Sequence, residues 1–335
     1  MAPEMEGVLQ GEWRKSATLR DMSFDPLGPL QAQPRLVTFM TDFGLRDPSA
    51  GVLSGVVLGI APEARTLDLT HAIPPYDVEA GAEALVESLI HLPIGAHVAV
   101  VDPGVGTQRR PIAIRCGRGD ALIGPDNGLL LPAAAALGGA VAAVILNDER
   151  WWGSSRSHTF HGRDLFAPVA AHLAAGVHFG ELGTAISPSE LVPATKLPIE
   201  IGDGVLHTSV RIVDGFGTLV LTGDRQAIEA SIGTLTAGEP LKITVGDKKL
   251  TTVWANRFGD VPEQEPLCYI DSAGRLALAI NRGSAAERYG AVRRTPVVIT
   301  RAYVHRRGQP PCYPSVRGGT TSTARRAPIT APPSH

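Results

Sequence analysis

The sequence predicts an α/β protein in which a mostly parallel sheet flanked by helices precedes a smaller, antiparallel, barrel-like β domain. In the first half, short β-rich apolar runs alternate with segments of helical spacing, as in parallel sheets with crossover helices. After about residue 195, helical spacing almost disappears and short strands with Gly/Asp turns follow. The 335 residues, 44% of them hydrophobic, can bury two cores, so two domains are expected.

The expected strands of the first half are "RLVTFM", "RTLDLT", "HVAVVD" and "ALIG", and the expected helices are "SAGVLSGVVLGI", "VEAGAEALVESLIHL" and "LFAPVAAHLAAG". Leu36 to Met40 and His97 to Val101 are nearly continuous apolar runs, which are typical of strands covered on both faces. In the second half, strands are expected in "VLHTSVRIVD", "GTLVLTG", "LKITVGDKKLTTVWAN", "PLCYIDSAGRLALAIN" and "TPVVITRAY".

These patterns divide the chain into an α/β domain at residues 34–195 and an all-β domain at residues 196–306. Residues 1–33 mix Pro, Gly, Gln and charge without a period, and residues 307–335 are rich in Pro, Ser, Thr and Arg. Both end segments are therefore expected to be disordered.

Charge and composition exclude several classes of partner. A net charge of −2 and a pI near 6.6 provide no basic surface for a nucleic-acid backbone. No apolar run approaches the roughly 18 residues that span a bilayer, and the first residues lack a signal peptide's apolar segment. We therefore expect a cytoplasmic protein without membrane contacts. Cys116, Cys268 and Cys312 are far apart and odd in number, which predicts free thiols.

Polar clusters directly follow four of the apolar strands: "TDFGLRD", "THAIPPYD", "DPGVGTQRR" and "PDNG". In an open parallel sheet, ligands bind beyond the carboxyl ends of the strands, so these clusters are expected to form a site together. Each cluster alone is equally well explained as turn chemistry, whereas four at one edge favour a binding site.

Three short motifs do not support the functions they suggest. "DFG" lacks the Gly-rich loop, the Val-Ala-Ile-Lys strand and the His-Arg-Asp loop of a protein kinase. "GVGTQRR" lacks the Gly-Lys-Ser/Thr of a phosphate loop, and Asp102 would repel a phosphate. His158 and His161 in "HTFHGRD" could hold a metal, but no third ligand has a recognisable spacing, so no metal site is expected.

The ordered set "TDFG", "LTHAIPPYDVEAGA", "VVDPGVGTQRR", "GPDNGLL" and "TFHGRDLFAPVAAHLAAG" resembles the S-adenosylmethionine (SAM) hydroxide adenosyltransferase family, relatives of fluorinating and chlorinating SAM enzymes. The resemblance covers about residues 35–303 and includes "VDGFGT" and "DSAGRLALAINRGSAAER". It implies hydrolysis of SAM to adenosine and L-methionine without a cofactor or a metal. It also implies a homotrimer, with each active site between the first domain of one copy and the second domain of its neighbour.

The resemblance implies that Asp102, Arg109 and His161 are the catalytic residues. Attack of water or hydroxide at the ribose C5′ expels methionine as a neutral thioether, so the site must place a nucleophile and need not protonate the leaving group. Arg109 would keep Asp102 ionised and oriented, but this pairing weakens Asp102 as a base. His161 is therefore the expected proton acceptor, and the alternative is that Asp102 and Arg109 only brace a turn.

The resemblance also implies which residues bind each part of SAM. Those expected at the ribose and the methionine part are Asp42 and Tyr76 (ribose), Asp47, Ser49 and Asp214 (ammonium) and Ser272 (carboxylate). Those expected at the adenine are Phe216, Thr218, Trp254, Asn281 and Arg282. For each aromatic residue, the alternative is an ordinary core position.

The chain departs from the halogenating relatives at several positions. Those enzymes carry an additional loop before the "PDNG" position, and they have Tyr, Thr and Ser where this chain has Asp102, Val105 and Gly162. A halide pocket is therefore not expected. Thr218 replaces a usual Asn at the adenine, and Ala273 replaces an Arg of the fluorinating enzymes. A non-catalytic SAM- or adenosine-binding module and a SAM-dependent halogenase stay open as alternatives.

Overall fold

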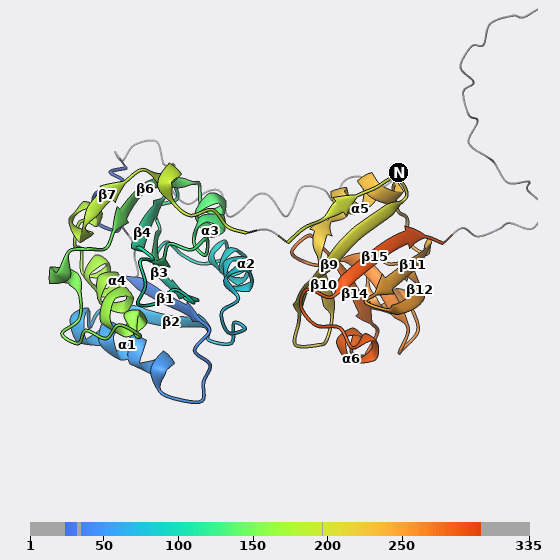
Figure 1. Ribbon diagram of the computed structural model, residues 1–335, viewed down its shortest axis with the longest axis horizontal. Helices are drawn as coiled ribbons and strands as arrows, with labels where there is room; N and C mark the ends of the chain where they lie inside the picture. Colours follow the sequence, from blue (N-terminus) through green and yellow to red (C-terminus); the bar gives the residue numbers. More distant parts are fainter. Residues whose placement is uncertain (1–23, 32–34, 196, 303–335) are drawn as a thin grey trace, which may run out of the picture.

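The computed structural model describes residues 24–31, 35–195 and 197–302, which form two lobes, each built around its own sheet (Figure 1). The first lobe contains a seven-stranded sheet in the order β2-β1-β3-β5-β4-β6-β7. Its strands are β1 (Leu36–Thr41), β2 (Arg65–Thr70), β3 (Ala96–Val100), β4 (Pro111–Cys116), β5 (Ala121–Pro125), β6 (Ala140–Ile145) and β7 (Thr184–Ile186). Its helices are α1 (Ser49–Ile60), α2 (Val78–Leu89), α3 (Leu131–Ala136), α4 (Ala167–Ala174), the π-helix η2 (Gly162–Phe166) and the 3-10 helices η1 (Glu149–Trp151), η3 (Phe179–Leu182) and η4 (Pro188–Glu190).

The carboxyl ends of four strands meet at one edge of this sheet. β1 pairs in parallel with β2 and with β3, and β3 pairs in parallel with β5. The pairs β5–β4, β4–β6 and β6–β7 are antiparallel. The predicted helix-flanked sheet is confirmed, and its four parallel neighbours are the strands that polar clusters follow in the sequence.

Helices cover both faces of the sheet. Helices α1 and α4 pack on one face and helices α2 and α3 on the other, each pair over its own apolar core. All six residues of β1 are buried, with Val37 and Phe39 in the first core and Met40 in the second. The continuous apolar run follows, because a strand between two helical layers has no solvent-facing side. None of the helices in the described ranges is long and apolar enough to cross a membrane.

The second lobe is a β-barrel, as predicted. Its sheet runs β10-β14-β13-β12-β11-β15-β9-β8, and an additional β9–β10 pairing closes seven of these strands into a barrel. The pairs are antiparallel except β12–β13, which is parallel. The elements are β8 (Glu200–Ile201), β9 (Val205–Val213), β10 (Leu219–Asp224), α5 (Arg225–Ile232), β11 (Pro240–Val245), β12 (Lys248–Trp254), η5 (Phe258–Asp260), β13 (Pro266–Ile270), β14 (Arg275–Ile280), α6 (Ala285–Tyr289) and β15 (Pro296–Arg301).

Residues 24–31 pack against the first lobe, so the predicted disordered extension is wrong for this stretch. Pro29 forms a β-bridge with His178. The buried guanidinium of Arg115 donates to the Pro29 carbonyl over 2.7 Å and lies 5.9 Å from the ring centroid of Phe24. The rest of the two predicted extensions lies outside the described residues.

Two of the three cysteines lie in the described chain. Cys116 and Cys268 are buried free thiols. Burial raises the pKa of each to about 12, so both stay protonated and unreactive near neutral pH. Cys312 lies outside the described residues.

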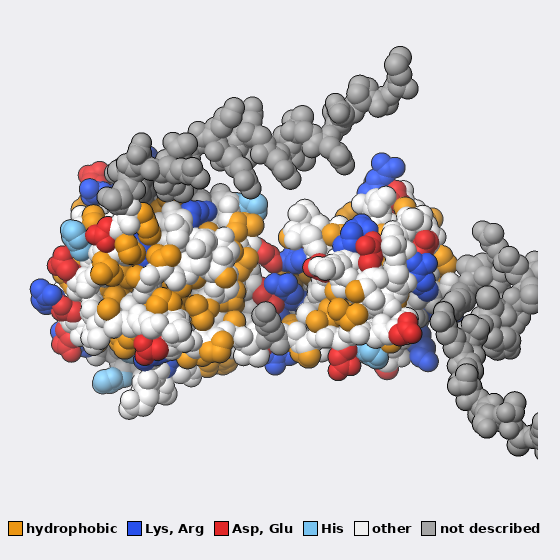
Figure 2. Space-filling view, turned by 90° about the horizontal axis from the view of Figure 1, so that it is seen from above, with side chains coloured by type: hydrophobic (Ala, Val, Ile, Leu, Met, Phe, Trp, Pro, Cys, Tyr) orange, Lys and Arg blue, Asp and Glu red, His pale blue; other side chains and the backbone are white. Residues whose placement is uncertain are grey.

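The two lobes contact each other through ion pairs. Helix α2 buries Ala80, Leu85 and Leu89 in the first lobe, and its glutamates pair with arginines of the barrel. None of the buried apolar clusters among the described residues includes side chains of both lobes. Acidic and basic side chains lie between the lobes (Figure 2). The interlobe ion-pair cluster consists of Asp77, Glu79, Glu83 and Glu87 with Arg211, Arg275, Arg293 and Arg294.

Arg293 occupies the centre of the interlobe ion-pair cluster. It pairs with Asp77, and its nitrogens lie 3.3 Å from Glu79 and 3.6 Å from Glu83. Glu83 also pairs with Arg211 over 2.8 Å, and burial raises the pKa of Glu83 despite this partner. The four acids face four arginines, so the contact buries no net charge.

We predict that Glu83→Arg weakens the contact between the lobes, because it adds a third arginine beside Arg211 and Arg293. In urea titrations of the full chain, the free energy of unfolding should fall by about 1–3 kcal/mol, between the values for exposed and buried pairs. Adding Arg211→Glu should recover part of this loss, since one pair re-forms while Arg293 still repels. Superimposable unfolding curves for wild type and Glu83→Arg would contradict the prediction.

Candidate active site

The loop after β3 brings Arg109 back to Asp102, seven residues earlier in the chain. The hydroxyl of Thr107 accepts the N–H of Arg109 over 3.3 Å and holds the second half of the loop. Gly106 has a φ of +77°, and a Cβ there would lie 2.8 Å from the carbonyl oxygen of His158. Glycine is therefore required at this turn both for its backbone conformation and for close packing.

Asp102, Arg109 and His161 lie together, as the sequence predicts. Arg109 Nε donates to Asp102 Oδ1 over 3.1 Å, and Arg109 Nη2 contacts the other carboxylate oxygen. Arg109 Nη2 also lies 3.1 Å from His161 Nδ1. The side chains of Arg109 and Asp102 are only 6% and 4% exposed. Arg109 Nη1 is buried without a hydrogen-bond partner among the described residues, so it can donate to a ligand or a water.

Arg109 determines the tautomer of His161. A guanidinium cannot accept a hydrogen bond, so His161 Nδ1 must be the acceptor and the neutral ring carries its proton on Nε2. Burial, and then the charge of Arg109, lower the pKa of His161 below its usual 6.5. His161 can therefore donate through Nε2, and this geometry does not favour its expected role as proton acceptor.

A cavity of about 160 Å³ opens at the sheet edge where β1 and β3 end. Asp102 and His161 line it, and Arg109 lies behind them without lining it. The predicted residues Asp42 and Tyr76 line it. The Tyr76 N–H donates to Asp42 Oδ2 over 2.9 Å, which leaves the other oxygen of Asp42 for a ligand. Tyr76 has a φ of +66°, and its side chain projects to the rim, 73% exposed.

Sequence reasoning missed the aromatic wall of this first cavity. Phe43 and Phe160 line it and pack edge to face, with ring centroids 5.6 Å apart. A Cβ at Gly162 would lie 3.2 Å from Phe43 Cζ, so Phe43 fills the space beside this glycine. Both phenylalanines lie inside motifs noted in the sequence, "TDFG" and "TFHGRD", and that position was the only signal for them.

The fourth polar cluster, "PDNG", supports the first cavity from outside and does not line it. Asp126 pairs with Arg110, whose Nε lies 2.8 Å away. The Asn127 side chain donates to the Val101 carbonyl over 2.9 Å, directly before Asp102. The expectation that all four clusters form the site is therefore wrong for this one, whose polar groups are used within the protein.

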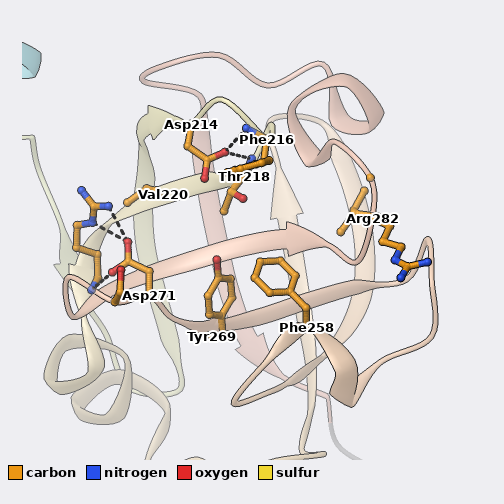
Figure 3. Close-up of a pocket in the computed structure, with 12 residues that line it drawn as sticks. Asp214, Phe216, Thr218, Val220, Phe258, Tyr269, Asp271 and Arg282 are labelled. Atoms are coloured by element: carbon orange, nitrogen blue, oxygen red, sulfur yellow. Dashed lines mark hydrogen bonds and ion pairs between the residues drawn. The ribbon is translucent and has the colours of Figure 1, made fainter. Parts of the chain in front are cut away.

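A second cavity, of about 720 Å³, lies in the barrel (Figure 3). Phe258 and Tyr269 stand on one side of it and pack edge to face, with centroids 5.3 Å apart. Asp214 and Thr218 lie opposite. Asp214 Oδ1 accepts the N–H groups of Phe216 (2.9 Å) and Thr218 (2.8 Å), which fixes the loop before β10.

The barrel cavity brings together five predicted residues: Asp214, Phe216, Thr218, Ser272 and Arg282. Sequence reasoning missed Phe258, Tyr269 and Asp271, which also line it. Asp271 directly precedes the predicted Ser272, and this adjacency was the available signal. The structure thus places seven of the eleven predicted substrate residues in two cavities on different lobes, which have no lining residue in common.

Two predicted adenine contacts require correction. Trp254 is 1% exposed and packs in the barrel core, with the Arg225 guanidinium 5.3 Å from its ring, so it presents no face to the cavity. The Asn281 N–H donates to the Glu265 carbonyl (3.0 Å), and the Asn281 carbonyl accepts the Gln264 N–H (2.8 Å). The backbone of Asn281 is therefore already paired within the barrel.

Asp47 and Ser49 lie at the N-terminal end of α1, outside both cavities. The Ser49 N–H donates to Asp47 Oδ1 over 2.8 Å, and hydrogen bonding to Ser49 lowers the pKa of the exposed Asp47. The structure does not bring these two residues to Asp214, which lies in the barrel cavity.

His158 does not complete a metal site with His161. His158 is exposed, and it does not line the first cavity. Within residues 24–31, 35–195 and 197–302, no group of three or more His, Cys, Asp or Glu side chains is placed to hold a metal ion.

Comparison with known families matches both lobes. Residues 37–183 match the N-terminal domain model of the SAM hydroxide adenosyltransferases, and residues 208–298 match the C-terminal domain model. The chain belongs to the SAM hydroxide adenosyltransferase family. The two matched ranges correspond to the lobe that contains the Asp102–Arg109–His161 group and to the barrel.

Individual relatives extend over most of this family member. It is 45% identical over 258 residues to a protein of Salinispora tropica named (R)-S-adenosyl-L-methionine hydrolase, covering 76% of this chain and 93% of that one. It is 30% identical over 311 residues to a fluorinase of Actinoplanes sp., covering 82% and 100%. A crystal structure of an uncharacterized conserved protein from Thermotoga maritima aligns with a TM-score of 0.72 at 29% identity, covering 79% and 100%.

We predict that His161 titrates below 6.5 and carries its proton on Nε2 when neutral. Since folding lowers this pKa, the contribution of His161 to stability is complete above pH 6.5 and is lost as the pH falls below 6.5. NMR titration of the histidine ring signals, assigned with His161→Asn, measures both the pKa and the tautomer. Arg109→Met should raise the pKa, because it removes a nearby positive charge. A wild-type pKa above 6.5, or a neutral ring protonated on Nδ1, would contradict this assignment.

Proposed function

We propose that this protein hydrolyses SAM to adenosine and L-methionine by attack of an oriented water or hydroxide at the ribose C5′. The observation that carries this proposal is the Asp102–Arg109–His161 group at the edge of the first cavity. Its relative in Salinispora tropica, named (R)-S-adenosyl-L-methionine hydrolase, supports the same reaction. No metal or organic cofactor is needed, because methionine leaves as a neutral thioether and the nucleophile is water.

Each residue of the group has a distinct role in the proposed reaction. Arg109 Nη1 and His161 Nε2 are donors, so they can hold the oxygen of the nucleophile and stabilise it as it becomes hydroxide-like. Asp102 accepts from Arg109 through both oxygens, and each oxygen retains a lone pair that can accept from a water. Asp102 is thus the hydrogen-bond acceptor of the group and takes the proton that an attacking water loses as its oxygen bonds to C5′, while the electrons of the broken C5′–S bond leave with methionine. The positive sulfonium of SAM further favours a negatively charged nucleophile beside it.

The barrel cavity complements the charge and shape of the substrate. Asp214 and Asp271 supply carboxylates for a ligand that carries an ammonium and a sulfonium. Phe216, Phe258 and Tyr269 supply apolar faces for the adenine. We assign the ribose to the first cavity, at Asp42, and the adenine and amino-acid ends to the barrel residues.

We propose further that the site is shared between copies of the chain in a homotrimer. The first cavity, about 160 Å³, is smaller than the roughly 300 Å³ of typical ligand pockets, and the barrel cavity lacks the Asp102–Arg109–His161 group. Tyr76 and Phe216 stand at the two rims, 73% and 86% exposed, as expected for surfaces that a neighbour covers. Contact between the first lobe of one copy and the barrel of the next is heterologous, so it can close into a ring.

We predict that the chain, incubated with SAM containing both sulfonium epimers, forms adenosine and L-methionine in equal amounts and consumes the (R) epimer that its relative's name specifies. Asp102→Ala and His161→Ala should each lower kcat by about 10²- to 10⁴-fold, the range for groups that polarise a reacting water. His158→Ala is the matched control and should remain near wild type, since His158 lies outside the cavity. Chromatography of the reaction measures both products.

The same assay distinguishes the alternatives. Tight binding of SAM with no adenosine above the uncatalysed background would favour a binding module and contradict the hydrolase proposal. A 5′-halo nucleoside that forms only with added halide would indicate a halogenase. A binding module is not expected, because the Asp102–Arg109–His161 group is intact. A halogenase is not expected, because Gly162 and Val105 lie at a cavity that Phe43 partly fills.

We predict that two inactive variants complement each other if the site is shared. Asp102→Ala damages the first cavity and Asp214→Ala damages the barrel cavity. An equal mixture, refolded together, should regain about a quarter of wild-type activity, because half of the first lobes and half of the barrels are intact and pair at random. A mixture of Asp102→Ala with His161→Ala should regain nothing, since both changes are in one cavity. No recovery in the first mixture would contradict a shared site.

A further inference from the structure

Asp164 anchors the segment that precedes His161, on the side away from the first cavity. This residue lies in the π-helix η2, is 4% exposed, and lines neither cavity. Its carboxylate accepts the N–H of Ser157 over 2.7 Å, and its backbone carbonyl accepts the N–H of Gly153 over 2.8 Å. Asp164 therefore fixes two points of the loop 153–160, which ends at the cavity wall.

Arg163 connects Asp164 to the aromatic wall of the first cavity. Its Nε and Nη2 donate to Asp164 over 2.6 and 2.9 Å, and Nη2 also donates to the Ser155 hydroxyl over 2.9 Å. Its guanidinium lies 5.0 Å from the ring centroid of Phe160, which lines the first cavity. The contacts thus run from Asp164 through Arg163 to Phe160.

The loop has little else to order it. Residues 153–159, "GSSRSHT", contain no large apolar side chain, and residues 154–156, 158 and 159 are exposed. Ordering such a chain costs backbone entropy at every residue, which hydrogen bonds must offset. Hydrogen bonds to a buried carboxylate are stronger than neutral ones. Burial alone would raise the pKa of Asp164, but the hydrogen bonds from Arg163 and Ser157 outweigh it and lower this pKa, so Asp164 stays ionised.

The π-helix places Asp164 on the side away from the cavity. The Ala167 N–H bonds to the Gly162 carbonyl, five residues back, so the first turn is wider than in an α-helix. Gly162 faces Phe43 in the cavity, and Asp164, two residues later, faces the loop. Wide turns of this kind recur at functional sites, where they set the direction of a side chain.

We propose that Asp164, acting through Arg163 and Ser157, is a positioning residue that holds Thr159, Phe160 and His161 as the wall of the first cavity. This inference rests on the proposed function. Asp164 touches neither the substrate nor the nucleophile. When Asp164 is lost, His161 still has its contact with Arg109, but the substrate must order the rest of the wall on binding, so the loss raises KM more than it lowers kcat.

The test uses the full chain and two variants. Asp164→Asn keeps an acceptor for Ser157 but turns an NH₂ group toward Arg163. Arg163→Lys keeps the charge but loses the paired donors and the flat contact with Phe160. Arg163 is partly exposed, so the second variant keeps the test valid if Asp164→Asn fails to fold. Asp148→Asn is the matched control, because Asp148 also pairs with a nearby arginine, Arg150, but does not line the cavity.

The expected result is a KM for SAM at least about tenfold higher in both variants, with a smaller change in kcat, whereas Asp148→Asn resembles wild type. Trypsin provides a readout that does not depend on activity. Cleavage after Arg156 should be slow in wild type and in Asp148→Asn and fast in both test variants, because the loop must leave its anchored conformation to be cut.

These readouts separate this inference from the proposed function. If the chain does not hydrolyse SAM but trypsin cuts only the test variants, the proposed function is wrong. The anchoring of the loop by Asp164 is then confirmed, but its role in the reaction is overturned. If both test variants fold with wild-type KM and wild-type cleavage after Arg156, or lose only thermal stability, Asp164 is an ordinary structural residue and the inference is overturned.

Discussion

Arg109 donates to Asp102 through two nitrogens and also contacts His161, and the geometry of the first cavity depends on this one guanidinium. Without it, Asp102, 4% exposed, would be an unpaired buried charge, which proteins avoid at a cost of several kcal/mol. The planar group donates in fixed directions, so its paired contact with Asp102 also determines where Nη1 points. Because it can only donate, it makes His161 Nδ1 an acceptor. Arg109 therefore determines three properties of the site: the charge of Asp102, the tautomer of His161 and the direction of the unpaired donor Nη1. The loop after β3 brings Arg109 to the position where it can do so.

The interlobe ion pairs connect residues next to the first cavity with residues next to the barrel cavity. Asp77, at the start of α2, directly follows Tyr76 of the first cavity and pairs with Arg293 of the barrel. At the other end of α2, Glu87 pairs with Arg275, which also holds Asp271 of the barrel cavity. The contact that joins the lobes thus holds one residue beside each cavity. Such a contact depends on the pairing of individual charges and not on buried apolar area, so the relative placement of the cavities is set by few side chains.

The sequence was sufficient to predict the position of a site residue where strand direction alone determines that position. It was insufficient where the position depends on how the barrel closes. Asp42 and Asp102 could be predicted at one edge because β1 and β3 run parallel and each residue directly follows its strand. Trp254 could not be placed correctly, because successive residues of a strand face opposite sides, and which side is the interior depends on how the barrel closes. Asn281 follows a strand as Asp102 does, but its backbone groups are used by a segment 16 residues earlier, Glu265, which no local pattern reveals. The anchoring by Asp164 likewise depends on a loop that returns to a helix.

The nature of Asp102 bears on which nucleophile the site accepts. A water can donate a hydrogen bond to a carboxylate while its oxygen accepts from Arg109 Nη1 and His161 Nε2, so it satisfies all three groups. A halide ion can accept from the two donors but has no proton to offer Asp102, and it would stand beside a like charge in a shielded site, where repulsion is stronger than in water. Removing the halide's hydration shell would add to this cost, because no group replaces the lost contacts on the Asp102 side. In the proposed reaction, the carboxylate that aims the water is therefore also the group that rejects the halide. This accounts for how a chain that is 30% identical to a fluorinase can serve hydrolysis.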